Sequence, residues 1–225
     1  MSKFFLIVEG IADVVFFRDY IIYLEEKLIK NEDTLKEKNN KFIRLQSESL
    51  EIKIFISGGY HQLGLISKTI EAHIDDGYKV LVIQDADNRV KDTKNGGVFL
   101  RLKYLDEIKE KYGVDFETFL FPNHKDDGDL ETLLLQIAQP NKYNNFECCN
   151  TSYINCLKEF VKEKYILELQ ADKDYVYNYI RMYHGHKKAK ERDRNYCLEY
   201  WDFDSDVMIP LKKFFEENIS ELQNS

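Results

Sequence analysis

The sequence has 225 residues but no apolar run near the ~20 residues that a membrane-spanning helix requires. Its first residues, MSKFFLIVEG, carry an acid and no small-residue cleavage site, unlike a secretory signal peptide. The four cysteines, Cys148, Cys149, Cys156 and Cys197, lack the spacing of a zinc site. We therefore expect reduced thiols in a cytoplasmic protein with no membrane partner.

The sequence also lacks a positive net charge, since its formal charge is −8. A protein that coats nucleic acid would be basic, so this class is disfavoured. An acidic enzyme can still act on phosphate when metal ions neutralise its pocket.

Basic residues are concentrated in one stretch, residues 181–194, for which we predict helical structure. They are Arg181, Lys187, Lys188, Lys190, Arg192 and Arg194. A basic helix can contact a phosphate backbone, so these six residues are candidates for nucleic-acid binding. An ordinary solvated helix face explains the charge equally well.

Hydrophobic periodicity predicts alternating strands and helices in the first part of the chain. The predicted strands are residues 3–8, 52–56, 79–84 and 115–121. The predicted helices begin at about residue 11 and cover residues 61–75, 98–112 and 130–138 further along. This order is typical of βαβ units, so we expect an α/β fold with a mostly parallel four-stranded sheet flanked by helices. Residues 31–51 are polar and weakly periodic, and we interpret them as a frayed helix end followed by a loop.

Strand signals stop beyond Pro140. The later predicted helices are residues 150–167, 173–183, 188–201 and 210–222. We expect an α/β domain over residues 1–140 and a helical C-terminal extension, residues 141–225, packed on it.

Carboxylates follow two of the predicted strands. The apolar run VLVIQDAD ends in Asp85 and Asp87, and Glu9 lies at the turn after the first strand. Residues two apart in an extended chain project to the same side, and open α/β sheets bind ligands beyond the carboxyl ends of their strands. Close carboxylates repel unless one is protonated or a cation lies between them, and a divalent cation is the simplest such cation. The plainer alternative is that one Asp caps the next segment and the other is solvated.

Three further acids fall in the first turns of predicted helices, where the helix dipole alone makes an acid favourable. Asp13 follows the first strand, whereas Asp129 and Glu131 open the helix at residues 130–138. Because the preceding strands all end at the same edge of the sheet, we expect Asp129, Glu131 or both to reach the pocket of Glu9 and Asp85. Acids at successive strand ends are typical of a Mg²⁺ site for phosphate chemistry.

Two of these segments resemble the motifs of a known family. LIVEGIAD, residues 6–13, resembles the glutamate motif of TOPRIM domains, and VIQDAD, residues 82–87, resembles their DxD motif. Together they resemble the TOPRIM half of the overcoming-lysogenization-defect (OLD) nucleases and small stand-alone relatives. The resemblance implies a TOPRIM/Rossmann-like sheet and a bound Mg²⁺ or Mn²⁺ ion. The metal ligands that it implies are Glu9, Asp13, Asp85, Asp87, Asp129 and Glu131.

The resemblance also implies that Glu9 and Asp85 take part in catalysis, together with a lysine in the C-terminal part. Lys187, Lys188 and Lys190 are the candidates, and the sequence does not choose among them. The implied partner is DNA or RNA. The chain lacks the G-x-x-x-x-G-K-[ST] loop of an ATPase domain, so an ATPase would be a separate subunit. The partner could also be a second copy of the chain in a homodimer, and the sequence does not decide the oligomeric state.

Two functions follow from these features. The first is metal-dependent cleavage of nucleic-acid phosphodiester bonds, in phage defence or DNA repair. The second is a non-catalytic TOPRIM-like module that binds nucleic acid or protein. The negative charge favours the module, whereas the set of acids favours the nuclease, because a pure binder has no reason to bear the repulsion of clustered carboxylates. A phosphatase or receiver-like domain with Asp85 as phosphoryl acceptor would leave Glu9 unexplained.

Overall fold

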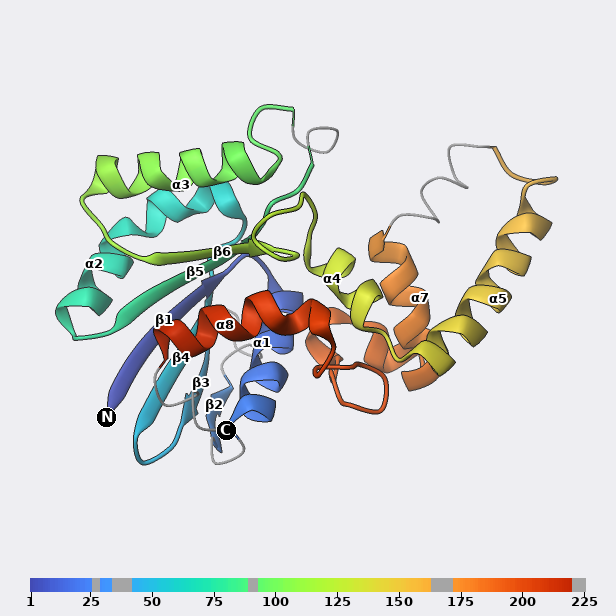
Figure 1. Ribbon diagram of the computed structural model, residues 1–225, viewed down its shortest axis with the longest axis horizontal. Helices are drawn as coiled ribbons and strands as arrows, with labels where there is room; N and C mark the ends of the chain where they lie inside the picture. The colour runs from blue at the N-terminus through green and yellow to red at the C-terminus, as the bar shows by residue number, and fades with distance from the viewer. Residues whose placement is uncertain (26–28, 34–41, 89–92, 163–171, 220–225) are drawn as a thin grey trace.

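The computed structural model describes residues 1–25, 29–33, 42–88, 93–162 and 172–219. Within these ranges the strands form one six-stranded sheet in the order β2-β3-β4-β1-β5-β6 (Figure 1). The strands are β1 (Ser2–Val8), β2 (Ile29–Asp33), β3 (Phe42–Gln46), β4 (Leu50–Ile56), β5 (Lys79–Asp85) and β6 (Glu117–Phe121). The pairs β4–β1, β1–β5 and β5–β6 are parallel, whereas β2–β3 and β3–β4 are antiparallel.

The predicted α/β fold with a mostly parallel sheet is confirmed, since the four predicted strands are the parallel ones. The prediction of four strands in total is wrong, because β2 and β3 lie largely in the segment interpreted as a helix end and loop. In β3 only Ile43 and Leu45 are buried, and they alternate with partly exposed residues. A five-residue strand with one buried face gives a weak apolar signal among charged neighbours.

Helices cover both faces of the sheet (Figure 1). The α-helices are α1 (Ile11–Leu24), α2 (Ser67–Asp75), α3 (Val98–Tyr112), α4 (Leu130–Ile137), α5 (Pro140–Leu157), α7 (Asp172–His184) and α8 (Ile209–Asn218). The 3-10 turns are η1 (Tyr60–Ile66), η2 (His186–Ala189), η3 (Glu191–Asp193) and η4 (Asp206–Met208). No helix of the described chain is both long and apolar enough to cross a membrane.

The strands alternate their side chains between two cores. In β1, Leu6 and Val8 face the core shared with α1 and α8, whereas Phe5 and Ile7 face the core shared with α2 and α3. Strand β5 alternates in the same way and has buried residues on both sides, as its apolar run predicts.

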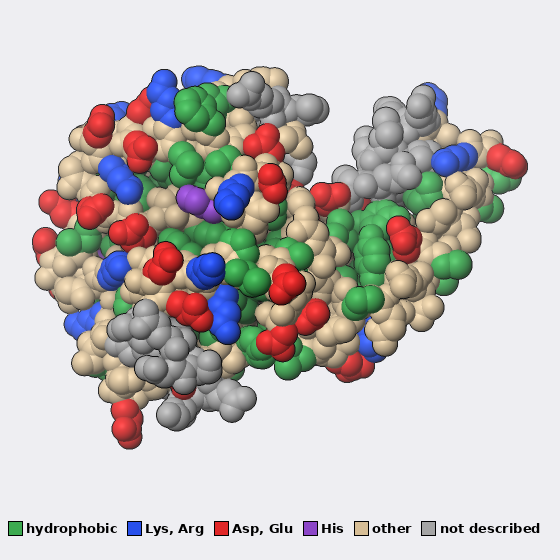
Figure 2. Space-filling view, viewed as in Figure 1, with side chains coloured by type: hydrophobic (Ala, Val, Ile, Leu, Met, Phe, Trp, Pro, Cys, Tyr) green, Lys and Arg blue, Asp and Glu red, His purple; other side chains and the backbone are tan. Residues whose placement is uncertain are grey.

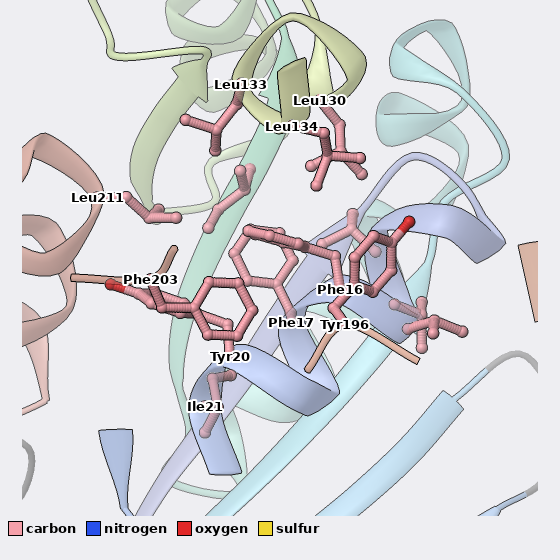
Figure 3. Packing of buried hydrophobic residues seen from close by; sticks show 14 of the residues in the cluster. Phe16, Phe17, Tyr20, Ile21, Leu130, Leu133, Leu134, Tyr196, Phe203 and Leu211 are labelled. Atoms are coloured by element: carbon pink, nitrogen blue, oxygen red, sulfur yellow. The ribbon is translucent and has the colours of Figure 1, made fainter. Parts of the chain in front are cut away.

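The C-terminal segment completes the core on the α1 face of the sheet. Figure 3 shows Phe16, Phe17 and Tyr20 of α1 beside Tyr196 and Phe203. The Phe16 ring lies 5.5 Å from that of Tyr196, and the Tyr20 ring lies 5.3 Å from that of Phe203. The two sides of residue 140 therefore share one core, and the predicted domain boundary stays a prediction.

The predicted helix at residues 188–201 is wrong. Helix α7 ends at His184, and Gly185 follows with φ of +80°, a left-handed conformation that glycine adopts without penalty. The short turns η2 and η3 come next. The basic stretch at residues 181–194 is consequently a helix end followed by two turns rather than one helix.

If the C-terminal segment is part of one cooperative core, Phe215→Ala will destabilise the whole protein. Phe215 is fully buried, and truncation of such a side chain costs about 3–5 kcal/mol. The free energy of unfolding measured in urea should fall by this amount. Circular dichroism and the fluorescence of Trp201 should report the same transition. Phe99→Ala is the control, because Phe99 is 72% exposed. A separate early fluorescence transition would show that the C-terminal part unfolds by itself.

Candidate functional site

The carboxyl ends of β1 and β5 lie side by side in the centre of the sheet. The chain leaves β1 for α1 on one face of the sheet, and it leaves β5 for α3 on the other face. Neighbouring strands whose connections diverge in this way form the switch point at which open α/β sheets bind ligands. Glu9 directly follows β1, and Asp85 is the last residue of β5.

Backbone hydrogen bonds join Glu9 and Asp85 to the start of α4. The amide of Asp85 donates to Oε1 of Glu9 at 3.1 Å, and the amide of Leu130 donates to Oδ1 of Asp85 at 3.0 Å. The expectation that the acids opening α4 lie near the two strand ends agrees with these contacts.

Asp85 lies at the electrostatic centre of the site. Burial raises its pKa well above the usual value, and the charges of Asp13, Glu9, Asp129 and Glu131 raise this pKa further. We refer to these five residues as the acidic group. Four of its members come from segments that are distant in sequence from Asp85, and the sheet topology brings them together.

Asp13 is also strongly perturbed. Burial raises its pKa to about 7, the charges of Glu9, Glu131 and Glu191 add to the rise, and the Gly10 amide, which donates at 2.7 Å, opposes it. Asp13 therefore has the role of an acid in the first turn of α1 and is also a member of the acidic group.

Burial also raises the pKa of two glutamates in the site. For Glu9 the charge of Arg101 opposes the rise, and the charge of Asp87 adds to it. For Glu131 the charge of Asp129 adds to the rise, and the charges of Lys173 and Arg194 oppose it.

Asp129 caps α4. Its Oδ1 accepts hydrogen bonds from the amide and hydroxyl of Thr132, at 2.9 and 2.7 Å. This carboxylate has a structural role at the N-terminus of the helix as well as a place in the acidic group.

Asp87 departs from the sequence-based expectation. Strand β5 ends at Asp85, and Asp87 adopts a left-handed conformation with φ of +55°, so extended-chain reasoning does not apply to it. Its amide donates to the carbonyl of Gly128 at 2.7 Å, and its Oδ2 forms an ion pair with Nη2 of Arg101 at 2.8 Å.

Sequence reasoning missed Arg101. This residue is fully buried, and its guanidinium carbon lies 3.6 Å from the centre of the Tyr60 ring. Arg101 shares the inner face of α3 with Leu105 and Ile108, at helical spacing. A charged residue in register with the apolar face of a predicted helix is the signal that could have identified it.

The basic residues of the C-terminal part differ in exposure. Arg181, Lys187, Lys190 and Arg192 are exposed, and the Lys188 side chain lies outside the described residues. In the part of the chain that is described, Lys187 and Lys190 form no hydrogen bond or ion pair with the acidic group. On the face in Figure 2, Lys and Arg are interspersed with Asp and Glu rather than gathered into one patch.

Arg194 is buried, so the expectation of a surface contact with nucleic acid is wrong for this residue. Its Nη1 donates to the Tyr196 hydroxyl at 3.2 Å, and its Nε donates to the Ala189 carbonyl at 3.4 Å. The guanidinium is therefore engaged inside the protein, where its charge acts on Glu131.

As the side chains stand, no group of three or more Asp, Glu, His or Cys residues in the described ranges could hold a metal ion. Glu9, Asp13 and Asp85 each accept a backbone hydrogen bond, and Asp87 pairs with Arg101, so closure around an ion requires side-chain rotation. The chemistry of the donor set fits a hard divalent cation, which takes oxygen ligands and relieves carboxylate repulsion.

Comparison with known proteins identifies a family. The model described as "Protein of unknown function (DUF3226)" matches residues 3–220. The chain belongs to this DUF3226 family. A search of curated proteins gives no match for this DUF3226 chain. A solved structure that matches is the crystal structure of hypothetical protein PH0156 from Pyrococcus horikoshii OT3. It is 12% identical with a TM-score of 0.44, and the match covers 85% of this chain and 99% of that one.

The raised pKa of Asp13 predicts that the metal-free protein loses stability as the pH rises. A carboxyl whose pKa is raised by folding contributes stability that is present below its ordinary pKa of 3.8 and is lost as the pH passes about 7. Thermal unfolding in EDTA should give a higher midpoint at about pH 6 than at about pH 8. Asp13→Asn should flatten this dependence, since an amide oxygen can still accept from Gly10.

Asp106→Asn is the matched control, because Asp106 is exposed on α3. Equal pH slopes for the Asp13 variant and the unsubstituted protein would contradict the assignment of the slope to Asp13.

Proposed function

We propose that this protein is a divalent-metal-dependent phosphodiesterase that cleaves nucleic acid. The observation that carries the proposal is the position of Asp85, partly buried at a topological switch point and surrounded by the charges of four other carboxylates. Carboxylates in this situation must be protonated or matched by a cation.

Structural roles account for only part of the acidic group. Asp13 and Asp129 hydrogen bond at the first turns of α1 and α4. Asp85 also accepts from the amide of Leu130, the first residue of α4, yet burial and neighbouring carboxylates raise the pKa of Asp85, Glu9 and Glu131 alike. A site that recruits an ion explains why these three carboxylates lie together.

The residues that would hold Mg²⁺ or Mn²⁺ are Glu9, Asp13, Asp85, Asp87, Asp129 and Glu131. The bound ion would neutralise charge that develops at the phosphodiester and activate a water molecule. Leu130 positions Asp85 through its amide, and Asp85 positions Glu9 in the same way. The resemblance of residues 6–13 and 82–87 to the TOPRIM motifs of OLD nucleases supports this assignment.

The setting that we propose is cytoplasmic, in phage defence or DNA repair. All four cysteines are free thiols, which agrees with a reducing compartment. Exposed Arg181, Lys187, Lys190 and Arg192 are available to a phosphate backbone. A separate ATPase subunit and a homodimer stay predictions from the sequence.

A non-catalytic module is the second candidate. This candidate is favoured by the geometry of the carboxylates. In the described part of the chain, no three Asp, Glu, His or Cys side chains are arranged so that they could hold a metal ion as they stand. Such a module would bind nucleic acid or protein through its exposed surface without a need for metal.

A cleavage assay distinguishes the two functions. End-labelled single- and double-stranded DNA and RNA are incubated with the protein in Mg²⁺, Mn²⁺ or EDTA. We expect metal-dependent cleavage that Asp85→Asn reduces by more than about 100-fold, the upper effect of losing a partner that only supports a metal ligand. Asp115→Asn should leave cleavage unchanged. Asp115 is exposed and precedes β6, so it lies at the amino ends of the parallel strands, away from the acidic group.

Binding of a polymer without cleavage under any metal would favour the module. Cleavage that persists in EDTA, or at full rate in Asp85→Asn, would show that the acidic group is not its source.

A further inference from the structure

Arg101 is a buried cation at the edge of the acidic group. Its side chain is 0% exposed, and its Nη2 lies 2.8 Å from Oδ2 of Asp87. A buried charge is costly unless it is paired and its donors are satisfied. The pair with Asp87 therefore accounts for the presence of a guanidinium inside the protein.

The pairing of Arg101 is incomplete. Its Nε and Nη1 atoms are buried and have no hydrogen-bond partner in the described part of the chain. Most buried donors in proteins find a partner, so a guanidinium with two open nitrogen atoms is unusual for a purely structural residue. An arginine that serves the site through its charge, rather than through a complete set of hydrogen bonds, would have this arrangement.

The neighbours of Arg101 connect it to both sides of the site. Its guanidinium stacks on the ring of Tyr60, and the Tyr60 backbone forms a hydrogen bond that lowers the pKa of Glu9. Its ion-pair partner, Asp87, lies two residues beyond Asp85. Arg101 is thus a positive charge close to two of the carboxylates that would bind metal.

We propose that Arg101 is a positioning residue that acts as the internal counter-ion of the site. It holds Asp87 while no divalent cation is bound, and an incoming cation must take Asp87 from it. This inference rests on the proposed function, because it assumes that the acidic group binds a divalent cation. Competition between the guanidinium and the metal ion then sets the metal affinity.

The direction of the effect separates this role from a structural one. Loss of a residue that merely supports the site loosens the ligands and weakens metal binding. Loss of a competing cation breaks the ion pair with Asp87, removes a repulsive charge and strengthens metal binding. Arg101→Gln should therefore bind Mg²⁺ about tenfold more tightly than the unsubstituted protein, within the usual range of coupling between two ligands.

Calorimetric titration of the full chain with Mg²⁺ tests the proposal. The variants are Arg101→Gln, Asp87→Asn and the double variant, and Lys103→Gln on the exposed face of α3 removes the same charge as a control. We expect tighter binding for Arg101→Gln, no change for Lys103→Gln, and a smaller gain from Arg101→Gln when Asp87 is already Asn. Circular dichroism reports whether each variant is folded.

Arg101→Lys keeps a cation but loses the planar fork, so it should give a smaller gain in affinity. This variant replaces Arg101→Gln if the latter does not fold. Equal or weaker Mg²⁺ binding by the folded Arg101 variants, with binding by the unsubstituted protein, would overturn the counter-ion role and leave the proposed function standing. Absence of Mg²⁺ binding in every variant would overturn both.

Discussion

Repulsion among carboxylates that are removed from water is the constraint on which the other features of this structure depend. Asp85 experiences the charges of Asp13, Glu9, Asp129 and Glu131, and burial reduces the screening of these charges by water. Backbone amides of Gly10, Asp85 and Leu130 offset part of this repulsion. Arg101 offsets another part through Asp87 and through its charge near Glu9.

The aromatic core holds these charges in place. Tyr196 and Phe203 from the C-terminal segment pack on Phe16 of α1, while Leu130 of α4 belongs to the same core. The residues that start α1 and α4 are therefore anchored by apolar burial beside the strand ends. Burial of apolar area supplies the stabilisation that compensates for the electrostatic cost of the acidic group.

Much of this arrangement could be predicted from the sequence because it depends on strong periodic patterns. The four apolar strands, helix α3 and the convergence of Glu9 with Asp85 follow from local patterns and from the rule for parallel sheets. The strands β2 and β3 could not be predicted, since the sequence of β2, IKNED, is mostly polar and β3 has a single buried face. Asp87 also departed from expectation, because its left-handed backbone is stabilised by a tertiary hydrogen bond to Gly128.

Buried charged residues also could not be predicted from the sequence. Arg101 and Arg194 look like surface residues in the sequence, yet both are buried. Their positions depend on partners that are distant or irregularly placed, such as the Tyr60 ring and the Tyr196 hydroxyl. No local pattern encodes such pairs, although the helical spacing of Arg101 with Leu105 and Ile108 is a usable signal.

Proton release on metal binding tests the acidic group most directly. Asp13, whose pKa is raised to about 7, holds a proton part of the time near neutral pH, and a metal ion must displace this proton because its ligands are deprotonated. Titration with Mg²⁺ near pH 7, in buffers that differ in ionisation enthalpy, counts the protons that are released. If the acidic group is the metal site, binding releases protons, and Asp85→Asn weakens the binding. Binding without proton release, or with unchanged affinity in that variant, would contradict the assignment.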